Sequence, residues 1–237
     1  MSRDRSKDLP KTTDALMAEL EREPEYQARI AAKEEERLVR MARNREDAAP
    51  IVDELVKAGF AVASIRELLT KKLNFRAAIP ILLAWLPKVT NLDVKESLVC
   101  TVSVPFAKPI AARPLIDEFR RAEDSATKLR WAIGNALAVV AEDDVLEDMI
   151  DLAKDRRYGK AREMVVVGLG NMIDPRVIPV LLDLLKDDEM NAHAIMALGK
   201  LRSRAARVYI VPFLKHQKAH VRNAAKKAIE KIDKGVH

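Results

Sequence analysis

Histidines, one cysteine and short acidic runs are the residues of this sequence whose types could do metal or acid–base chemistry. His216 and His220 have the spacing of a metal-binding pair on one helix, but HQKAH falls where one helix should turn into the next. Cys100 is the only cysteine, which excludes an internal disulfide and a cysteine-based zinc cluster. The acidic runs at 142–144 and 186–189 fall in expected turns, where helix capping explains them better than acid–base work. We therefore predict no catalytic residue, no metal site and no cofactor.

The C-terminal part of the chain is a basic block whose chemistry suits phosphate groups. Residues 200–237 hold 11 basic and 2 acidic side chains, a net charge of +9, whereas residues 143–199 hold 7 and 12, a net charge of −5. A surface of this charge attracts phosphates, with an affinity that falls steeply in salt. The alternative is a solubilising terminal cap, and the interleaved aromatics of single-strand binders are nearly absent. The candidate anion-binding or nucleic-acid-binding residues are Arg204, Arg207, Lys215, Lys218, Arg222, Lys226 and Lys227.

Helices are the elements that must position these residues. The chain has 237 residues, of which 49% are hydrophobic but only 4% are aromatic, and this composition favours helices over strands. From residue 50 the sequence repeats itself, usually with a proline in register. Proline in the first turn of a helix loses no hydrogen bond, so each should mark a helix start, with Pro50 in the same role earlier. The register positions, spaced 34, 33, 32 and 33 residues apart, are Pro80, Pro114, Glu147, Pro179 and Pro212.

A second segment follows each of these, with small or apolar residues at helical spacing. One repeat is thus a helix pair that cannot bury its own apolar face, and stacking several pairs buries a continuous core. We expect an all-α fold in which residues 50–237 are a solenoid of about five to six helix pairs. The second segments are VKESLVCTVSV from 94, LRWAIGNALAVV from 129, AREMVVVGLGNM from 161, MNAHAIMALGKL from 190 and VRNAAKKAIEKI from 221.

The last repeats carry the marks of a known family. Small-Leu-Gly closes one helix, Asp-Pro-Arg fills the turn, Ile-Pro opens the next helix and Val-Arg opens the inner one, as in GLGNMIDPRVIPVLLDLLKDDE. This pattern resembles HEAT-type, armadillo-like repeats, in the bacterial variant shared with phycobilin-lyase-like proteins, over about residues 50–235. The resemblance implies a right-handed α-solenoid, an α-α superhelix. It also implies that first helices line the convex side and second helices the concave side, which usually binds a protein or a nucleic acid.

Two neighbouring positions at the start of each second helix are candidate contact residues. The Val-Arg position holds Lys95, Arg130, Arg162, Asn191 and Arg222. It is either a basic ladder for phosphates or, as the resemblance implies, a structural position bonded to an acidic residue of the preceding turn, with Asp93, Asp124 and Asp155 as partners. The next position should be exposed on the concave face, because it holds mostly small or polar residues: Glu96, Trp131, Glu163, Ala192 and Asn223.

Trp131 is the most informative of these residues. On an exposed concave surface it could anchor a peptide or stack on a base, since tryptophan is enriched at binding hot spots. The alternative is that it folds over a gap between repeats. Trp85, by contrast, occupies a position that is apolar in other repeats and is expected in the core.

Residues 1–49 are expected to be a polar tail and an N-terminal helical extension. Tyr26, Ile30, Leu38 and Met41 form a thin apolar stripe, which suits either packing along the first repeat or docking with a partner or second copy. The charged N-terminus is not a secretory signal, and no stretch approaches the ~20 apolar residues of a membrane span. We therefore expect a cytoplasmic protein without a membrane partner.

The expected function is a non-enzymatic binding scaffold that holds a protein partner on its concave side. Its candidate partner-binding residues are Glu96, Arg130, Trp131, Arg162, Glu163 and Asn223. The alternative is a DNA-binding protein that uses the basic C-terminal repeats. A remote alternative is a HEAT-like DNA glycosylase, in which Trp131 would act with Glu96 or Glu163.

Overall fold

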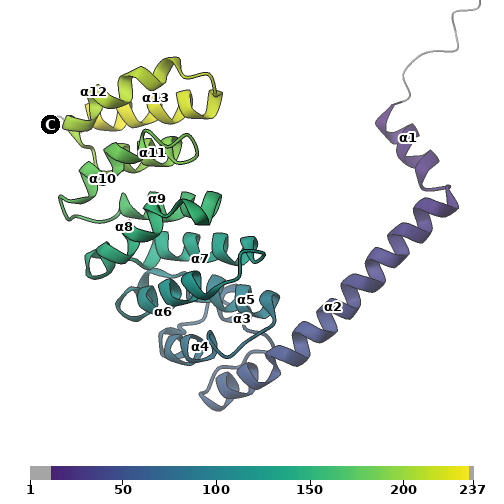
Figure 1. Ribbon diagram of the computed structural model, residues 1–237. Helices are drawn as coiled ribbons and strands as arrows, with labels where there is room; N and C mark the ends of the chain where they lie inside the picture. Colours follow the sequence, from purple (N-terminus) through teal and green to yellow (C-terminus); the bar gives the residue numbers. More distant parts are fainter. Residues whose placement is uncertain (1–11, 235–237) are drawn as a thin grey trace, which may run out of the picture. The chain divides into compact units, whose positions relative to one another are not determined.

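The computed structural model describes residues 12–234, which are helical and contain no strand (Figure 1). The chain divides into two compact units between Glu46 and Asp47. The polar tail expected at the N-terminus lies outside the described residues as far as residue 11. The first unit holds α1 (Thr13–Leu20) and most of α2 (Pro24–Lys57). In α2 an apolar stripe is exposed, with 44% of Ile30, 53% of Leu38 and 54% of Met41 accessible to solvent.

The second unit is a stack of helix pairs. It begins with the end of α2 and the short helix α3 (Glu67–Thr70). Five pairs follow, each made of a first helix, a turn and a second helix that packs on the second helix of the neighbouring pair. The pairs are α4 (Ile79–Trp85) with α5 (Leu92–Val102), α6 (Lys108–Arg121) with α7 (Thr127–Val140), α8 (Leu146–Lys154) with α9 (Glu163–Leu169), α10 (Val177–Leu184) with α11 (Asn191–Lys200), and α12 (Arg207–Ile210), continued by the 3-10 segment η6 (Val211–Lys215), with α13 (Ala219–Asp233).

Prolines mark most of the predicted helix starts, but not all of them. Pro80, Pro179 and Pro212 lie in the first turn of their helical segments, as expected. Pro114 lies inside α6, which begins six residues earlier at Lys108, and Pro50 lies inside α2. The predictions that these two prolines begin helices are therefore wrong. In α6 a second proline, Pro109, occupies the first turn, and in α2 a long charged segment already propagates the helix before Pro50 is reached.

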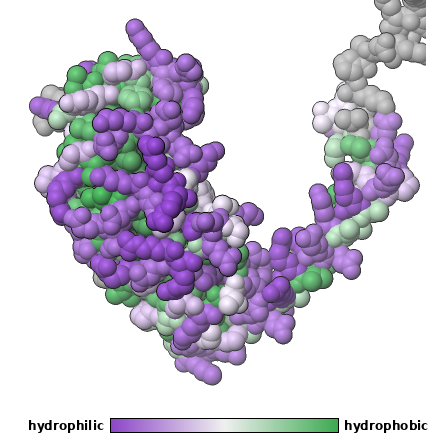
Figure 2. Space-filling model, in the orientation of Figure 1, coloured by the Kyte–Doolittle hydropathy of each residue, from purple (hydrophilic) through white to green (hydrophobic). Residues whose placement is uncertain are grey.

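Small residues bring the second helices into close contact. A Cβ atom placed on Gly199 of α11 would lie 2.6 Å from the backbone Cα of Ala228 in α13. The same substitution at Gly170 would bring a Cβ within 2.8 Å of the Cα of Ala197. The alanine and glycine positions of the repeat are therefore set by backbone-to-backbone packing between neighbouring pairs. In the space-filling view of Figure 2, hydrophilic side chains cover much of the stack and hydrophobic residues show between them.

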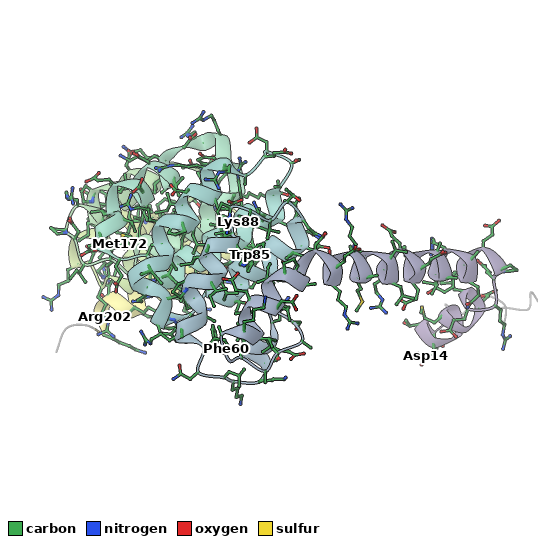
Figure 3. All side chains as sticks on the ribbon, turned by 90° about the horizontal axis from the view of Figure 1, so that it is seen from below. Asp14, Phe60, Trp85, Lys88, Met172 and Arg202 are labelled. Atoms are coloured by element: carbon green, nitrogen blue, oxygen red, sulfur yellow. The ribbon has the colours of Figure 1, made fainter. Side chains whose placement is uncertain are left out.

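The edge of the core differs from expectation at Trp85, and Cys100 also lies there. Trp85 is only partly buried, and its indole Nε1 donates a 2.6 Å hydrogen bond to the Glu54 carboxylate. The ammonium of Lys88 lies 5.2 Å from the centre of the indole ring (Figure 3). Cys100 is likewise half-buried, and desolvation raises the pKa of its thiol. Tryptophan carries a polar N–H that needs a partner, which favours the rim over the interior.

Candidate partner-binding site

The Val-Arg position at the start of each second helix is a structural position in this fold. Lys95 is 8% exposed, and its ammonium donates to the carboxylate of Glu118 in the next pair at 2.5 Å. Arg130 is 6% exposed, and its guanidinium donates to Asp124 at 2.8 Å and to the carbonyls of Phe119 and Ala122. Because buried charges need such partners, these side chains hold the turn and the next repeat in place.

Arg162 is the most deeply buried member of the series, with 1% of the residue exposed. Its guanidinium donates to the carboxylates of Asp187 and Glu189, each at 3.2 Å, and to the carbonyls of Ala153 and Gly159. Burial disfavours the charged Asp187 carboxylate, but the Glu189 N–H and the Arg162 guanidinium outweigh this, so the pKa of Asp187 is lowered. The acidic run at 186–189 therefore joins two repeats as well as shaping a turn.

These contacts differ from two of the predicted ion pairs. Arg130 and Arg162 are buried and their guanidinium groups bond within the fold, although Arg130 also lines the groove described below. Asp124 is the acid that holds Arg130, as expected. Asp155 instead pairs with Arg157 at 2.6 Å, and the partner of Lys95 is Glu118. For Lys95 and Arg162 the acidic partners come from the following repeat. The sequence pattern of a single repeat does not predict such pairs.

Trp131 lies in an open groove on the second-helix face, by which we mean the surface formed by α5, α7, α9, α11 and α13. The groove has a volume of about 730 Å³, and 53% of Trp131 is exposed in it. A groove of this size lies in the range of ligand and peptide pockets. We call it the Trp131 groove; it is lined by Glu96, by Asp124, Thr127, Lys128, Arg130 and Trp131, and by residues 157–161.

An irregular connection between α8 and α9 forms one wall of the Trp131 groove. Within it Tyr158 packs edge-on against Phe119, with ring centres 5.0 Å apart, and the guanidinium carbon of Arg130 lies 5.0 Å from the Tyr158 ring. Gly159 has φ 48° and ψ −133°, a conformation that L side chains rarely adopt. The repeat pattern does not predict this wall; its signal in the sequence is the run RRYGK, which holds an aromatic residue, a glycine and three cations.

The other predicted contact residues fall in different places. Glu96 lines the Trp131 groove and is therefore the carboxylate that shares it with Trp131. Glu163 does not line it; its carboxylate lies 3.9 Å from Nε2 of His193 in α11. Asn223 of α13 lines a second groove further along the same face. Of the two carboxylates that the glycosylase alternative pairs with Trp131, only Glu96 is in place.

The second groove, with a volume of about 470 Å³, lies where α11 and α13 meet. Its rim is basic and its floor is apolar, and 48% of Met196 is exposed in it. We call it the lysine groove. Its lining residues are Val167, Met196, Ala197, Lys200, His220, Asn223, Ala224, Lys227, Ala228 and Lys231.

The predicted residues of the basic block differ in their surroundings. Lys227 is the only one of its seven predicted residues that lines the lysine groove. Arg207 pairs with Asp233 at 2.7 Å, and Arg222 donates to the carbonyls of His216 and Gln217, each at 2.7 Å. The remaining members are exposed and pair with no carboxylate in the part of the chain that the structure describes: Arg204, Lys215, Lys218 and Lys226.

Within residues 12–234, no three His, Cys, Asp or Glu side chains are placed to hold a metal ion. His216 ends η6 and His220 lies in α13, so the two do not share one helix. No helix in the described part of the chain is long and apolar enough to span a membrane.

A stack of helix pairs with grooves on its second-helix face defines an α–α solenoid. A family model described as HEAT repeats matches residues 112–192, from α6 to the beginning of α11. Residues 112–192 are therefore a HEAT-repeat domain, a kind of domain that generally serves as a protein-interaction scaffold and is typically non-catalytic. The matched segment contains Trp131, Arg162 and most of the Trp131 groove. No curated protein matches the chain.

Proposed function

We propose that this protein is a non-enzymatic scaffold that binds a protein partner at the Trp131 groove. The observation that carries the proposal is the exposure of Trp131, 53% of which is accessible in an open groove of a HEAT-repeat domain. Exposure of the apolar indole surface to water is unfavourable, and burial against a partner would remove this surface from water. Tryptophan is also enriched among the residues that contribute most to binding energy.

The charges around Trp131 favour a protein over a nucleic acid at this groove. Lys128 and Lys160 are exposed cations, whereas Glu96 places a carboxylate on the same rim. Arg157 is held by Asp155, which reduces its availability. A mixed rim around an aromatic anchor complements a polypeptide that inserts an apolar side chain between polar neighbours. A phosphate backbone would meet the Glu96 carboxylate unfavourably.

Affinity purification from the native cell tests the proposal. The wild-type protein, Trp131→Ala and Tyr209→Ala are compared, with and without nuclease. Tyr209 is a matched control because 56% of it is exposed on α12, away from the second-helix face. We expect a protein that co-purifies with the wild type and the control in both conditions, but not with Trp131→Ala. Equal recovery with all three proteins would refute the Trp131 groove as the binding site.

Nucleic-acid binding by the basic C-terminal repeats is the second candidate function. It is favoured by four exposed cations, Arg204, Lys215, Lys218 and Lys226, that pair with no carboxylate among the described residues. Each phosphate neutralised releases counterions, so the affinity for duplex DNA should fall steeply as salt rises. Lys226→Glu with Lys227→Glu should weaken binding and flatten this salt dependence. Absence of duplex binding at low salt would remove this candidate.

A further inference from the structure

We propose that the lysine groove binds an acidic, extended segment of the protein partner, with carboxylates on alternate residues and aliphatic side chains between them. This inference rests on the proposed function, since it names the chemistry of a second contact on the same face. Three features of the groove carry it: the sign of its charges, their spacing along α13, and the apolar floor between them.

The groove concentrates cations without acids. Lys200, Lys227 and Lys231 line it from two helices, and no Asp or Glu is among its lining residues. Lys227 and Lys231 are exposed and pair with no carboxylate in the described part of the chain. The ammonium of Lys200 donates to the side-chain oxygen of Asn171, a neutral partner that leaves its charge uncompensated. Such a surface selects an anionic ligand by charge complementarity.

The spacing of the cations matches an extended chain. Lys227 and Lys231 are one turn apart on α13, which corresponds to about 6 Å along the helix axis. Alternate residues of an extended peptide lie about 6.6 Å apart and point to the same side. An Asp-X-Asp sequence lying along α13 can therefore place one carboxylate at each ammonium, while the X side chain points to the opposite side, toward Met196 of α11.

The apolar floor separates a peptide from a single nucleic-acid strand. Met196 is 48% exposed there, next to Val167 and the alanines that pack α11 on α13. Methionine adapts its shape to aliphatic ligands. Single-stranded nucleic acids, by contrast, are held by large aromatic side chains on which bases stack, and no Phe, Tyr or Trp lines this groove. His220 is the only ring at its edge, so the lining favours aliphatic contacts flanked by carboxylates.

The two grooves lie within reach of one segment. The second helices α7, α9, α11 and α13 are consecutive neighbours in the stack. Packed helices are separated by 8–10 Å, so two to three steps place the lysine groove about 20–25 Å from Trp131. An extended chain covers this span in roughly six to eight residues. The partner segment should therefore carry an apolar anchor for Trp131 and acidic residues about that far along the sequence.

Fluorescence anisotropy at low ionic strength tests this inference with defined probes. The probe is a labelled nine-residue peptide of alternating Asp and Leu with terminal glycines; its uncharged control replaces each Asp by Asn. We expect binding of the acidic peptide alone, and a loss of about tenfold in affinity in Lys227→Glu with Lys231→Glu. The matched control, Lys215→Glu with Lys218→Glu, changes the net charge equally outside the groove and should cost much less.

Three outcomes would overturn the inference. These are an equal loss in both double variants, equal binding of the uncharged peptide, and tighter binding of a thymidine oligonucleotide that displaces the peptide. The result is separable from the proposed function, because Trp131 does not line the lysine groove and neither Lys227 nor Lys231 lines the Trp131 groove. Suppose that Trp131→Ala abolishes partner capture, while the double variant at Lys227 and Lys231 keeps its affinity for the peptide and still captures the partner. The inference then fails and the proposed function stands.

Discussion

Replacing Arg162 by methionine should strongly destabilise the stack of helix pairs, although the sequence pattern alone does not show that this arginine is buried. The guanidinium is buried and donates to two carboxylates and to the carbonyls of Ala153 and Gly159. Removing one partner of a buried ion pair costs about 3–5 kcal/mol, because the remaining charge stays desolvated. Glu189 is half-exposed and regains water, and Asp187, although largely buried, keeps Arg156 at 3.5 Å. We therefore expect a loss near the lower end, about 3 kcal/mol.

Urea and thermal unfolding followed by circular dichroism measure this loss. For a unit of this size, about 3 kcal/mol corresponds to a fall of roughly 6–12 °C in the melting temperature. Arg176→Met is the matched control, because Arg176 also contacts two carboxylates, Asp174 and Glu147, but its side chain is 59% exposed. An exposed pair contributes little to stability, because water screens both charges. If Arg162→Met costs no more than Arg176→Met, the structural role of the buried arginine is refuted.

Two further predictions concern the contacts between α11 and its neighbours. Gly199→Ala should lower the free energy of unfolding by up to about 2 kcal/mol. The new Cβ would meet Ala228 at 2.6 Å, an overpacking that costs about 1–3 kcal/mol and outweighs a gain of about 1 kcal/mol in helix propensity. A variant with a higher urea midpoint would contradict this. Burial lowers the pKa of His193; the negative charge of Glu163 opposes this shift and the charge of His220 adds to it. As the pH falls, His193 is therefore protonated at a higher pH in the unfolded chain than in the folded protein. Stability should fall as the pH drops through about 6.5; His193→Gln should flatten this part of the pH profile, and identical profiles would refute the assignment.

The helix pairs were predictable because their signal repeats along the chain. Pro80, Pro179 and Pro212 fix three helix starts, and the small residues of the second segments lie where backbones meet. The errors at Pro50 and Pro114 share a cause. A proline can lie inside a helix that begins at an earlier residue. It removes one backbone hydrogen bond of that helix but does not determine where the helix begins.

The candidate site was predictable only in part. The exposure of Trp131 agrees with the polar character of its position in other repeats, so one sequence was enough to single it out. The wall formed by Tyr158 and Gly159 has no counterpart in the other repeats. A prediction made from the repeat pattern therefore does not include it. The lysine groove depends on which of several exposed lysines face the α11 side of α13. Lys226 and Lys227 are neighbours in sequence, yet only Lys227 lines the groove.

The two positions at the start of each second helix show why neighbouring residues in this fold have different roles. Successive helical residues are turned by about 100°, so one position points into the junction between repeats while the next points out of it. Arg130 and Trp131 illustrate the result: the arginine is 6% exposed and the tryptophan 53%. The charged group at the inner position is bonded to partners within the fold. We therefore expect a substitution there to lower stability. Under the proposed function, variants meant to test partner binding therefore belong at the outer position and along the groove rims.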